Sequence, residues 1–442
     1  MSTLQKTCRK HLNPDALLAT LRRRFESLPD RRRSPSYSLA DTLMAGFALF
    51  SLKDPSLIAF EQRKHDPHSN LYSVFRLKQI PSDTHMREIL DEINPSCLRP
   101  CFTDWFRELQ RGKVLEPFRF LDDYYLMAVD GCEHYASQKV FCPECMRRQH
   151  KNGTNTYYHQ MLGAVLIHPE RRQVLPLMPE PIIQQDGTTK NDCERNAAKR
   201  FFPAFRAEHP HLPVVVVGDG LNSNAPLIRE LQDLRIRFVL VAHPSDHAFV
   251  FAQLEDRFRE GKAETLTSYA EATRTWFHYR WVNGLPLNES NQDVPVNLLE
   301  YWEIRDGDIV YSNSWVTDIP VTAEQVELLV RGGRARWKVE NETFNTLKNQ
   351  GYNFEHNFGH GKQHLCTVFS ILMMLAFCFD QIQQICCKVF QEALEKAGSK
   401  RLLWERMRHV FHTLALVSLL QLYEVLRRRL AKQAPVFVED SS

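Results

Sequence analysis

The sequence predicts an α/β fold in which helices flank a central sheet, with a helical region before the sheet and a mostly β insertion within it. Between residues 124 and 241, short apolar runs typical of buried strands alternate with helix-like segments. Between residues 246 and 321 the alternation stops, and aromatic-rich segments of period two replace it. At 442 residues the chain is long enough for two or three domains.

The first 118 residues are predicted to be helical. Ser38 and Ser56 stand where N-cap residues stand, each directly before an apolar run, and residues 81–84 mark a third helix start. This region could bind DNA or mediate dimerisation, and a plain structural bundle is the equal alternative.

The sheet domain is predicted in two parts, 119–245 and 322–390, with the insertion at 246–321 between them and a helical tail at 391–442. The first part should contain strands at 124–129, 157–167, 214–218 and 237–241, and helices at 192–206 and 225–234. In the insertion, strands are expected at 274–281 and 308–315, and Asn283-Gly284 and Asp306-Gly307 predict turns. Residues 322–349 and most of 361–429 should be helical.

The 11 cysteines and the polar first residues favour reduced thiols in a cytosol over a disulfide framework. The longest apolar run, 365–379, is shorter than the roughly 20 residues of a membrane span. It predicts a buried core helix and no membrane association. The net charge is only +3, but arginine clusters at 22–24, 31–33, 147–148 and 427–429 could contact phosphates, or could be solvated helix faces.

Two aspartates stand at the ends of predicted strands, where ligand-binding residues are expected. Asp130 and Asp219 each follow an apolar strand and precede a glycine. In an open α/β sheet, the carboxyl ends of strands face the ligand crevice. Carboxylates that meet there repel one another unless a cation is present, and Mg²⁺ prefers carboxylate oxygens. A third carboxylate should come from a helix packed on the sheet.

Glu340 is the candidate for that third carboxylate. Arg336 lies four residues before it, on the same helix face, and Trp337 and Phe344 are predicted to mark the buried side. An ordinary salt-bridged surface helix is the alternative interpretation. Glu342 is the fallback ligand.

The segment 336–340, Arg-Trp-Lys-Val-Glu, resembles the arginine–glutamate core of the tyrosine-arginine-glutamate-lysine signature in bacterial insertion-sequence DDE transposases. Similar pieces lie in the same order at residues 81–87, 129–131, 190–200, 218–220 and 354–359. This sequence departs from the signature at two positions: Gly333 replaces the tyrosine, and Lys348 comes one residue later than the signature's lysine.

The resemblance implies an RNase H-like fold and a DNA transposase that cleaves and joins strands by two-metal phosphoryl transfer. Asp130, Asp219 and Glu340 would bind two Mg²⁺ ions, with Mn²⁺ as a substitute, and Arg336 would contact the scissile phosphate. The partners would be the element ends and target DNA, bound by a homodimer, in the cytoplasm of a bacterium at its nucleoid. An RNase H-fold endonuclease with other biology and a non-catalytic DNA-binding descendant are the alternatives.

Further DNA contacts are expected from Lys348 and from the insertion, where Trp281 and Trp315 could stack on a base pushed out of the duplex. The alternative is that these tryptophans form the core of a small β unit.

Cys142 and Cys145 form a Cys-x-x-Cys pair, which is half of a tetrahedral zinc site. The other half would have to come from Cys132, His134, His150 or His159. Two reduced cysteines on a structured loop, without a metal, are the alternative.

Overall fold

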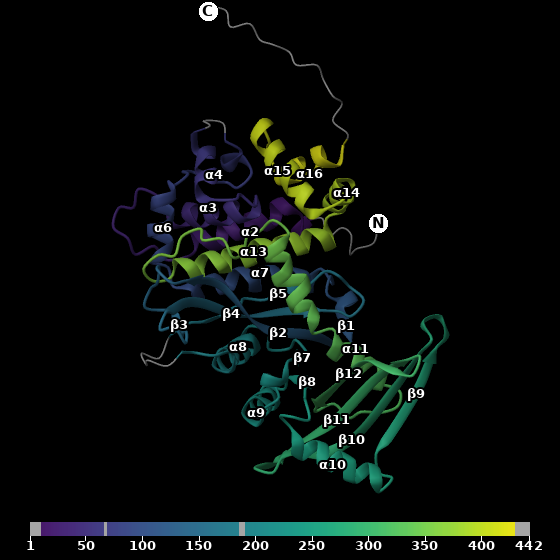
Figure 1. Ribbon diagram of the computed structural model, residues 1–442. Helices are drawn as coiled ribbons and strands as arrows, with labels where there is room; N and C mark the ends of the chain where they lie inside the picture. The colour runs from purple at the N-terminus through teal and green to yellow at the C-terminus, as the bar shows by residue number, and fades with distance from the viewer. Residues whose placement is uncertain (1–9, 66–68, 185–190, 429–442) are drawn as a thin grey trace, which may run out of the picture. The chain divides into compact units, whose positions relative to one another are not determined.

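The computed structural model describes residues 10–65, 69–184 and 191–428. Its contacts divide the chain into two units, one made of Met1–Met86 with Ile382–Ser442 and the other of Arg87–Gln381. Colour in Figure 1 follows residue number, so the helices of the first unit, which come from both ends of the chain, are purple and yellow. The strands of the second unit are blue and green.

The first unit is helical in its described part. Ser38 and Ser56 are N-caps as predicted: their side chains accept hydrogen bonds from the backbone N–H groups of Asp41 (3.0 Å) and Ala59 (3.1 Å). Its elements are α2 (Pro14–Glu26), α3 (Leu39–Ser51), α4 (Leu57–Glu61), η1 (Gln62–His65), α5 (Asn70–Ser73), α14 (Lys388–Ala397), α15 (Lys400–Thr413) and α16 (Leu419–Arg427), and α6 (Asp83–Asp91) begins at its border.

Buried polar contacts connect the distant ends of the chain within this unit. The Asn70 amide donates to the carbonyls of Phe411 (2.6 Å) and Leu414 (2.7 Å). Arg22, from the first arginine cluster, is buried in an ion pair with Asp41 at 2.5 Å, so its guanidinium does not face solvent. Arg429, of the last cluster, lies outside the described residues.

The second unit is built on one mixed sheet whose strand order is β3-β4-β2-β7-β8-β12-β11-β10-β9. β2 pairs antiparallel with β4 and parallel with β7, β7 pairs parallel with β8, and β12 then pairs antiparallel with β8. The strands are β1 (Arg119–Phe120), β2 (Tyr124–Ser137), β3 (Met146–Gln149), β4 (Asn155–Ile167), β5 (Leu175–Pro176), β6 (Glu180–Ile182), β7 (Val214–Gly218), β8 (Arg237–Val241), β9 (Glu264–Ala270), β10 (Thr275–Asn288), β11 (Asn291–Arg305) and β12 (Asp308–Thr317).

Helices flank this sheet: α8 contacts β4 and β6, α9 contacts β8, α10 contacts β10, and α11 contacts β7 and β8. The predicted class, a mixed α/β sheet with flanking helices and a mostly β insertion, is confirmed. The helical elements are η2 (Pro95–Leu98), α7 (Arg99–Arg111), η3 (Glu116–Phe118), α8 (Glu194–Glu208), η4 (Gly220–Asn222), α9 (Ala225–Asp233), α10 (Ala248–Arg259), η5 (Glu271–Thr273), α11 (Val326–Arg334), η6 (Val339–Phe344), α12 (Asn345–Asn349) and α13 (Leu365–Cys386).

Three local predictions need correction or refinement. The strand that carries Asp130 does not end there; β2 continues to Ser137, paired with β4 alone. Asp306-Gly307 forms the predicted turn, with both φ angles positive, whereas Asn283-Gly284 is a bulge inside β10, where the register with β11 shifts.

The apolar helix α13 has 22 residues, long enough for a membrane span by length and composition. Its apolar window is wholly buried inside the protein, which agrees with the predicted core helix.

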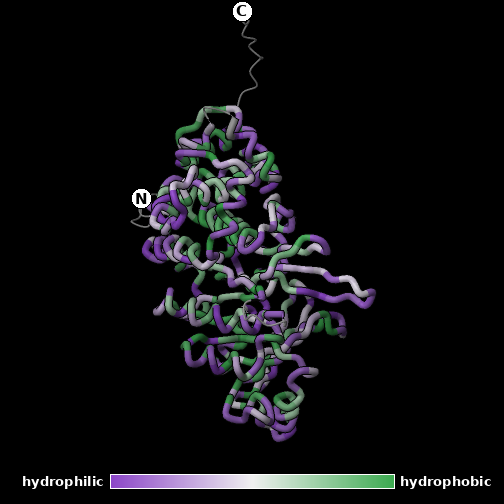
Figure 2. Tube along the Cα trace, turned by 90° about the vertical axis from the view of Figure 1, so that its left-hand side faces the viewer, coloured by the Kyte–Doolittle hydropathy of each residue, from purple (hydrophilic) through white to green (hydrophobic). Residues whose placement is uncertain are grey.

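The apolar residues of the central strands form the core. The four valines of β7 are fully buried, and so are Leu126, Met127 and Ala128 beside them on β2. Figure 2 shows hydrophilic residues along many of the outer turns and hydrophobic residues along the segments between them.

Gly333 explains one departure from the signature. It lies on α11 against the buried indole of Trp315, and a Cβ atom at this position would lie 2.6 Å from the indole nitrogen. A tyrosine side chain has no room here unless Trp315 moves.

We therefore expect Gly333→Ala to lower the melting temperature, with an overpacking cost of about 1–3 kcal/mol. An unhindered glycine-to-alanine change inside a helix would instead stabilise by about 1 kcal/mol. Arg331→Ala on the same helix is the control, because Arg331 makes an exposed ion pair with Glu170. A melting temperature for Gly333→Ala at or above that of the unaltered protein would contradict this packing.

Candidate functional site

The parallel pairing of β2 with β7 places two aspartates in one row. Ala128 is in register with Val217, so Asp130 on β2 and Asp219, just after the end of β7, each come two residues later. Both side chains are partly exposed. Ligand oxygens of Asp130, Asp219 and Glu194 lie within 4.8 Å of one another. The two aspartates predicted from the sequence are therefore brought together.

Asp219 is held in place by its own turn. It caps η4, and its Oδ1 accepts hydrogen bonds from the Leu221 backbone N–H (3.1 Å) and the Asn222 amide (2.9 Å). Both bonds use the same oxygen. This arrangement orients the carboxylate and leaves Oδ2 available for a ligand.

Glu194, the first residue of α8, is the site residue that the sequence analysis did not single out. It lies in one of the transposase-like segments, 190–200, of which Lys190 falls outside the described residues. Gly131 makes room for it: a Cβ atom at that position would lie 2.1 Å from the Glu194 Oε1. Burial and the charge of Asp219 raise the pKa of Glu194.

Arg336 connects Asp130 to Glu340. Its Nη1 lies 3.1 Å from Asp130 Oδ2, and its Nη2 lies 2.9 Å from Glu340 Oε1. The predicted pairing of Arg336 with Glu340 is therefore present, and it extends to a carboxylate 206 residues away in the sequence. Glu340 joins the group beside Asp130, whereas Glu194 is the residue whose oxygens approach both aspartates.

The four carboxylates, hereafter the acidic cluster (Asp130, Glu194, Asp219 and Glu340), crowd one another electrostatically. Burial and, next, a hydrogen bond with the Glu340 carboxyl raise the pKa of Asp130 to about 7, although the nearby charge of Arg336 opposes the rise. Without a cation, the cluster therefore favours a shared proton. A divalent ion would supply the missing positive charge.

The helix that carries Glu340 differs from the predicted one. Trp337 is 44% exposed, so it does not mark the buried side; Val339, Thr343 and Phe344 do. Phe344 lies over Gly163, the β4 partner of Asp130, where a Cβ atom would come within 2.6 Å of its ring. The close approach of this ring to the sheet fixes the helix beside Asp130.

Residues 339–344 form a π-helix, which accounts for the late position of Lys348. A π-helical turn holds one residue more than an α-helical turn, so it absorbs an inserted residue without rotating the following side chains by about 100°. Leu347 is buried, while Lys348 forms an ion pair with Glu355 at 2.8 Å. Its charge also acts on Cys132, two residues after Asp130.

Trp281 and Trp315 are 1% and 0% exposed, which corrects their predicted role in stacking on a base. Both rings are core side chains, as the alternative held in part: Trp315 lies on β12 of the insertion but packs against Gly333 of α11, outside it. Trp276 is 49% exposed on β10 and contacts Tyr269 with ring centroids 4.7 Å apart. An exposed aromatic pair is therefore available on this strand.

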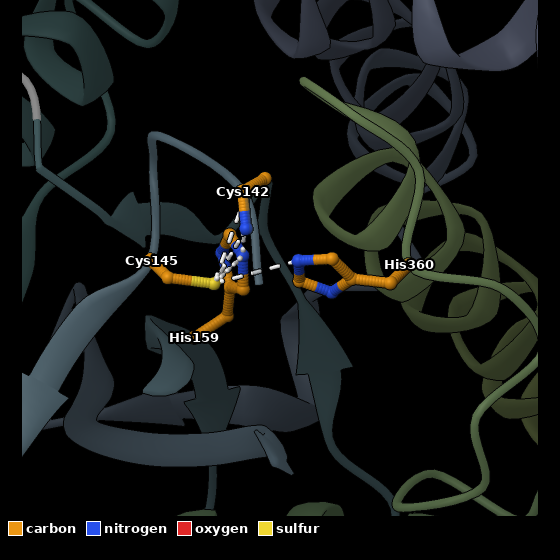
Figure 3. A group of neighbouring side chains, drawn as sticks. All are labelled: Cys142, Cys145, His159 and His360. Atoms are coloured by element: carbon orange, nitrogen blue, oxygen red, sulfur yellow. Dashed lines mark hydrogen bonds between the residues drawn. The ribbon is translucent and has the colours of Figure 1, made fainter. Parts of the chain in front are cut away.

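A second group of side chains lies elsewhere in the same unit. Cys142, Cys145, His159 and His360, hereafter the Cys/His cluster, are all buried, and their ligand atoms lie within 4.8 Å of one another. Figure 3 shows the four side chains directed at one centre. Of the four residues expected to complete the pair, only His159 takes part.

The other three candidates lie outside this cluster. Cys132 is buried near Lys348, His134 faces Cys366 at 4.0 Å, and exposed His150 bonds to Thr156 at 2.8 Å. His360 was missed because it lies far along the chain from the cysteines, where no short spacing rule applies.

No protein-family model and no curated protein matches this sequence. Among solved structures, the chain is similar to one described as the cryo-EM structure of the piggyBac transposase synaptic complex with hairpin DNA. The identity is 10% and the TM-score 0.40, over 99% of this chain and 87% of the other.

We expect Mn²⁺ or Mg²⁺ to raise the melting temperature, because a bound cation relieves the repulsion in the acidic cluster. A ligand at about 100 times its Kd stabilises by about 2.7 kcal/mol, which corresponds to several degrees. Asp219→Ala should abolish this shift, whereas Asp256→Ala, on the exposed face of α10, should leave it unchanged. Equal shifts in the two variants, measured by calorimetry, would place the ion elsewhere.

Proposed function

We propose that this protein is a DNA transposase that cleaves DNA and joins strands at the acidic cluster. One observation carries the proposal: carboxylates from β2, from the turn after β7, from α8 and from η6 converge with Arg336 at one end of the β2–β7 pair. A purely structural salt bridge between Arg336 and Glu340 would not require the two aspartates. The four carboxylates come from segments that are far apart in the sequence, so only the folded chain brings them together.

The donor set fits Mg²⁺, with Mn²⁺ as a substitute. The cluster offers carboxylate oxygens alone, which hard divalent cations prefer, and its charge is only partly balanced by Arg336. Asp130, Asp219 and Glu340 would hold two ions, and Glu194 offers a fourth carboxylate. Bound there, the ions would activate water or a 3′-hydroxyl and stabilise the leaving oxygen.

Arg336 would position the substrate. In the free protein its guanidinium pairs with Asp130 and Glu340, and its planar fork suits a phosphate oxygen pair equally well. Once cations neutralise the carboxylates, the guanidinium can turn toward the scissile phosphate. Lys348 would add a second positive charge on the same side of β2.

The DNA would also meet exposed aromatic side chains. Trp337 lies next to Arg336, and Trp276 lies on the insertion; either ring could stack on an unpaired base. Strand joining brings two DNA ends together, so we propose that two copies of the chain act on DNA. The setting would be the cytoplasm of a bacterium.

Loss of a metal-binding carboxylate should abolish cleavage. Asp130→Asn and Asp219→Asn keep size but remove charge, and we expect nicking of DNA that carries the sequences flanking the coding region to fall roughly 100-fold or more. DNA binding, measured by gel shift, should remain. Comparing Glu340→Gln with Glu194→Gln then identifies the third ligand, as the one whose loss costs as much as that of Asp130.

Cleavage that survives both aspartate variants would overturn the proposal. Metal-dependent cleavage without strand joining would support the endonuclease alternative instead. DNA binding with no cleavage under any divalent ion would favour a non-catalytic descendant.

Arg336→Lys should lower the cleavage rate by about tenfold or more, because lysine keeps the charge but lacks the bidentate fork. Arg331→Lys, which changes an exposed ion pair on the preceding helix, serves as the matched control. An unchanged rate for Arg336→Lys, at saturating DNA, would leave Arg336 with only its salt-bridge role.

A further inference from the structure

We propose that the Cys/His cluster binds one Zn²⁺ ion, which ties the loop after β2 and strand β4 to the segment that precedes α13. Cys142 and Cys145 lie on the loop between β2 and β3, His159 lies on β4, and His360 lies between α12 and α13. Pairing of β3 with β4 already brings the cysteine loop next to His159, so the ion would chiefly add His360, which lies on neither strand.

The distances within the cluster fit a tetrahedral ion. The two sulfur atoms are 3.8 Å apart. With zinc–sulfur bonds of about 2.3 Å, the edge of a tetrahedron between two sulfurs is about 3.8 Å. The sulfur separation is nearly twice a disulfide bond of about 2.05 Å, so the pair is not oxidised.

The sulfur–nitrogen distances agree as well. His159 Nε2 lies 3.4 Å from Cys142 Sγ and 3.3 Å from Cys145 Sγ, and His360 Nε2 lies 3.4 Å from Cys145 Sγ. Zinc–nitrogen bonds of about 2.0–2.1 Å predict an edge of about 3.5 Å. Each imidazole therefore directs the same nitrogen, Nε2, at the sulfurs.

The loop between the cysteines is arranged to hold thiolate sulfur. Cys145 donates its backbone N–H to the Cys142 carbonyl at 3.1 Å, which closes a tight turn. The Cys142 backbone N–H in turn points at Cys145 Sγ at 3.4 Å. A donor aimed at sulfur stabilises its charged form, which is the form that binds metal.

The cluster is closed. All four side chains are buried, and they supply the complete Cys₂His₂ ligand set of a structural zinc site, which keeps no position for a substrate or water. The alternative, four hydrogen-bonded polar side chains without an ion, would bury two thiols and two imidazoles with only weak sulfur bonds among them.

The proposed ion would also stiffen the surroundings of the acidic cluster. His159 pairs with Tyr135, five residues beyond Asp130 on β2, and the Tyr135 ring stacks on His360 at 4.3 Å. The segment that leads to His360 contains Glu355, the ion-pair partner of Lys348. This coupling to the chemistry rests on the proposed function, whereas the presence of zinc does not.

The test is the zinc content of the full-length chain, purified without chelator and analysed by elemental mass spectrometry. We expect about one zinc per chain, falling below about 0.2 in Cys142→Ser and in His360→Ala. Cys132→Ser is the matched control, since Cys132 is a buried cysteine of the same region outside the cluster, and it should retain the metal. Asp130→Asn should retain zinc while losing cleavage, which separates the two proposals.

A second measurement covers variants that fail to fold. Wild-type protein loaded with Co²⁺ in place of zinc should show the visible absorption of tetrahedral thiolate coordination, and a strong chelator should lower its melting temperature. Wild-type protein that carries less than about 0.2 zinc after incubation with excess Zn²⁺ and buffer exchange would overturn the proposal. So would full zinc content in a folded Cys142→Ser variant.

Discussion

The parallel pairing of β2 with β7 is the interaction on which the rest of the second unit depends. Its register buries the β2 residues before Asp130 against the four valines of β7 and sets Asp130 level with Asp219. Sliding one strand by one residue would turn its apolar side chains to the opposite face. The same register therefore serves the core and the site, and the core's apolar burial holds together two carboxylates that repel each other.

Other elements pack closely around β2 and β7 at positions where glycine has no side chain. Gly131 leaves space for Glu194, Gly163 for the ring of Phe344, and Gly333 for the indole of Trp315. At each glycine, an added Cβ atom would lie within 3.0 Å of a side chain from another element. Close packing at these points brings the carboxylates of α8 and η6 within reach of β2.

Local patterns in the sequence predicted the elements well. The runs before Asp130 and Asp219 are buried strands, and the four-residue spacing of Arg336 and Glu340 gives the expected ion pair. Patterns of this kind report which side of an element is buried. They also hold only in a regular α-helix. Residues 339–344 form a π-helix, and Trp337 is therefore exposed, although the spacing predicted that it would be buried.

Contacts between distant segments could not be predicted in the same way. Glu194 lies in the acidic cluster and His360 in the Cys/His cluster only because the fold brings distant segments together. The periodicity of a segment does not predict which distant residues it will contact. The sequence also did not predict that β2 continues beyond Asp130 to Ser137. This part of β2 pairs with β4 alone, and it lacks the continuous apolar run that is typical of a strand buried on both faces.

The scatter of the acidic cluster along the chain has a consequence during protein synthesis. A ribosome that has added 300 residues has made Asp130, Glu194 and Asp219, but neither Arg336 nor Glu340. The nascent chain at that stage contains three of the four carboxylates but not the arginine that pairs with Asp130 and Glu340 in the full-length chain. Prematurely terminated products of that length therefore lack the arginine that bridges the cluster, and only ribosomes that pass the Glu340 codon release chains with the full set of charges.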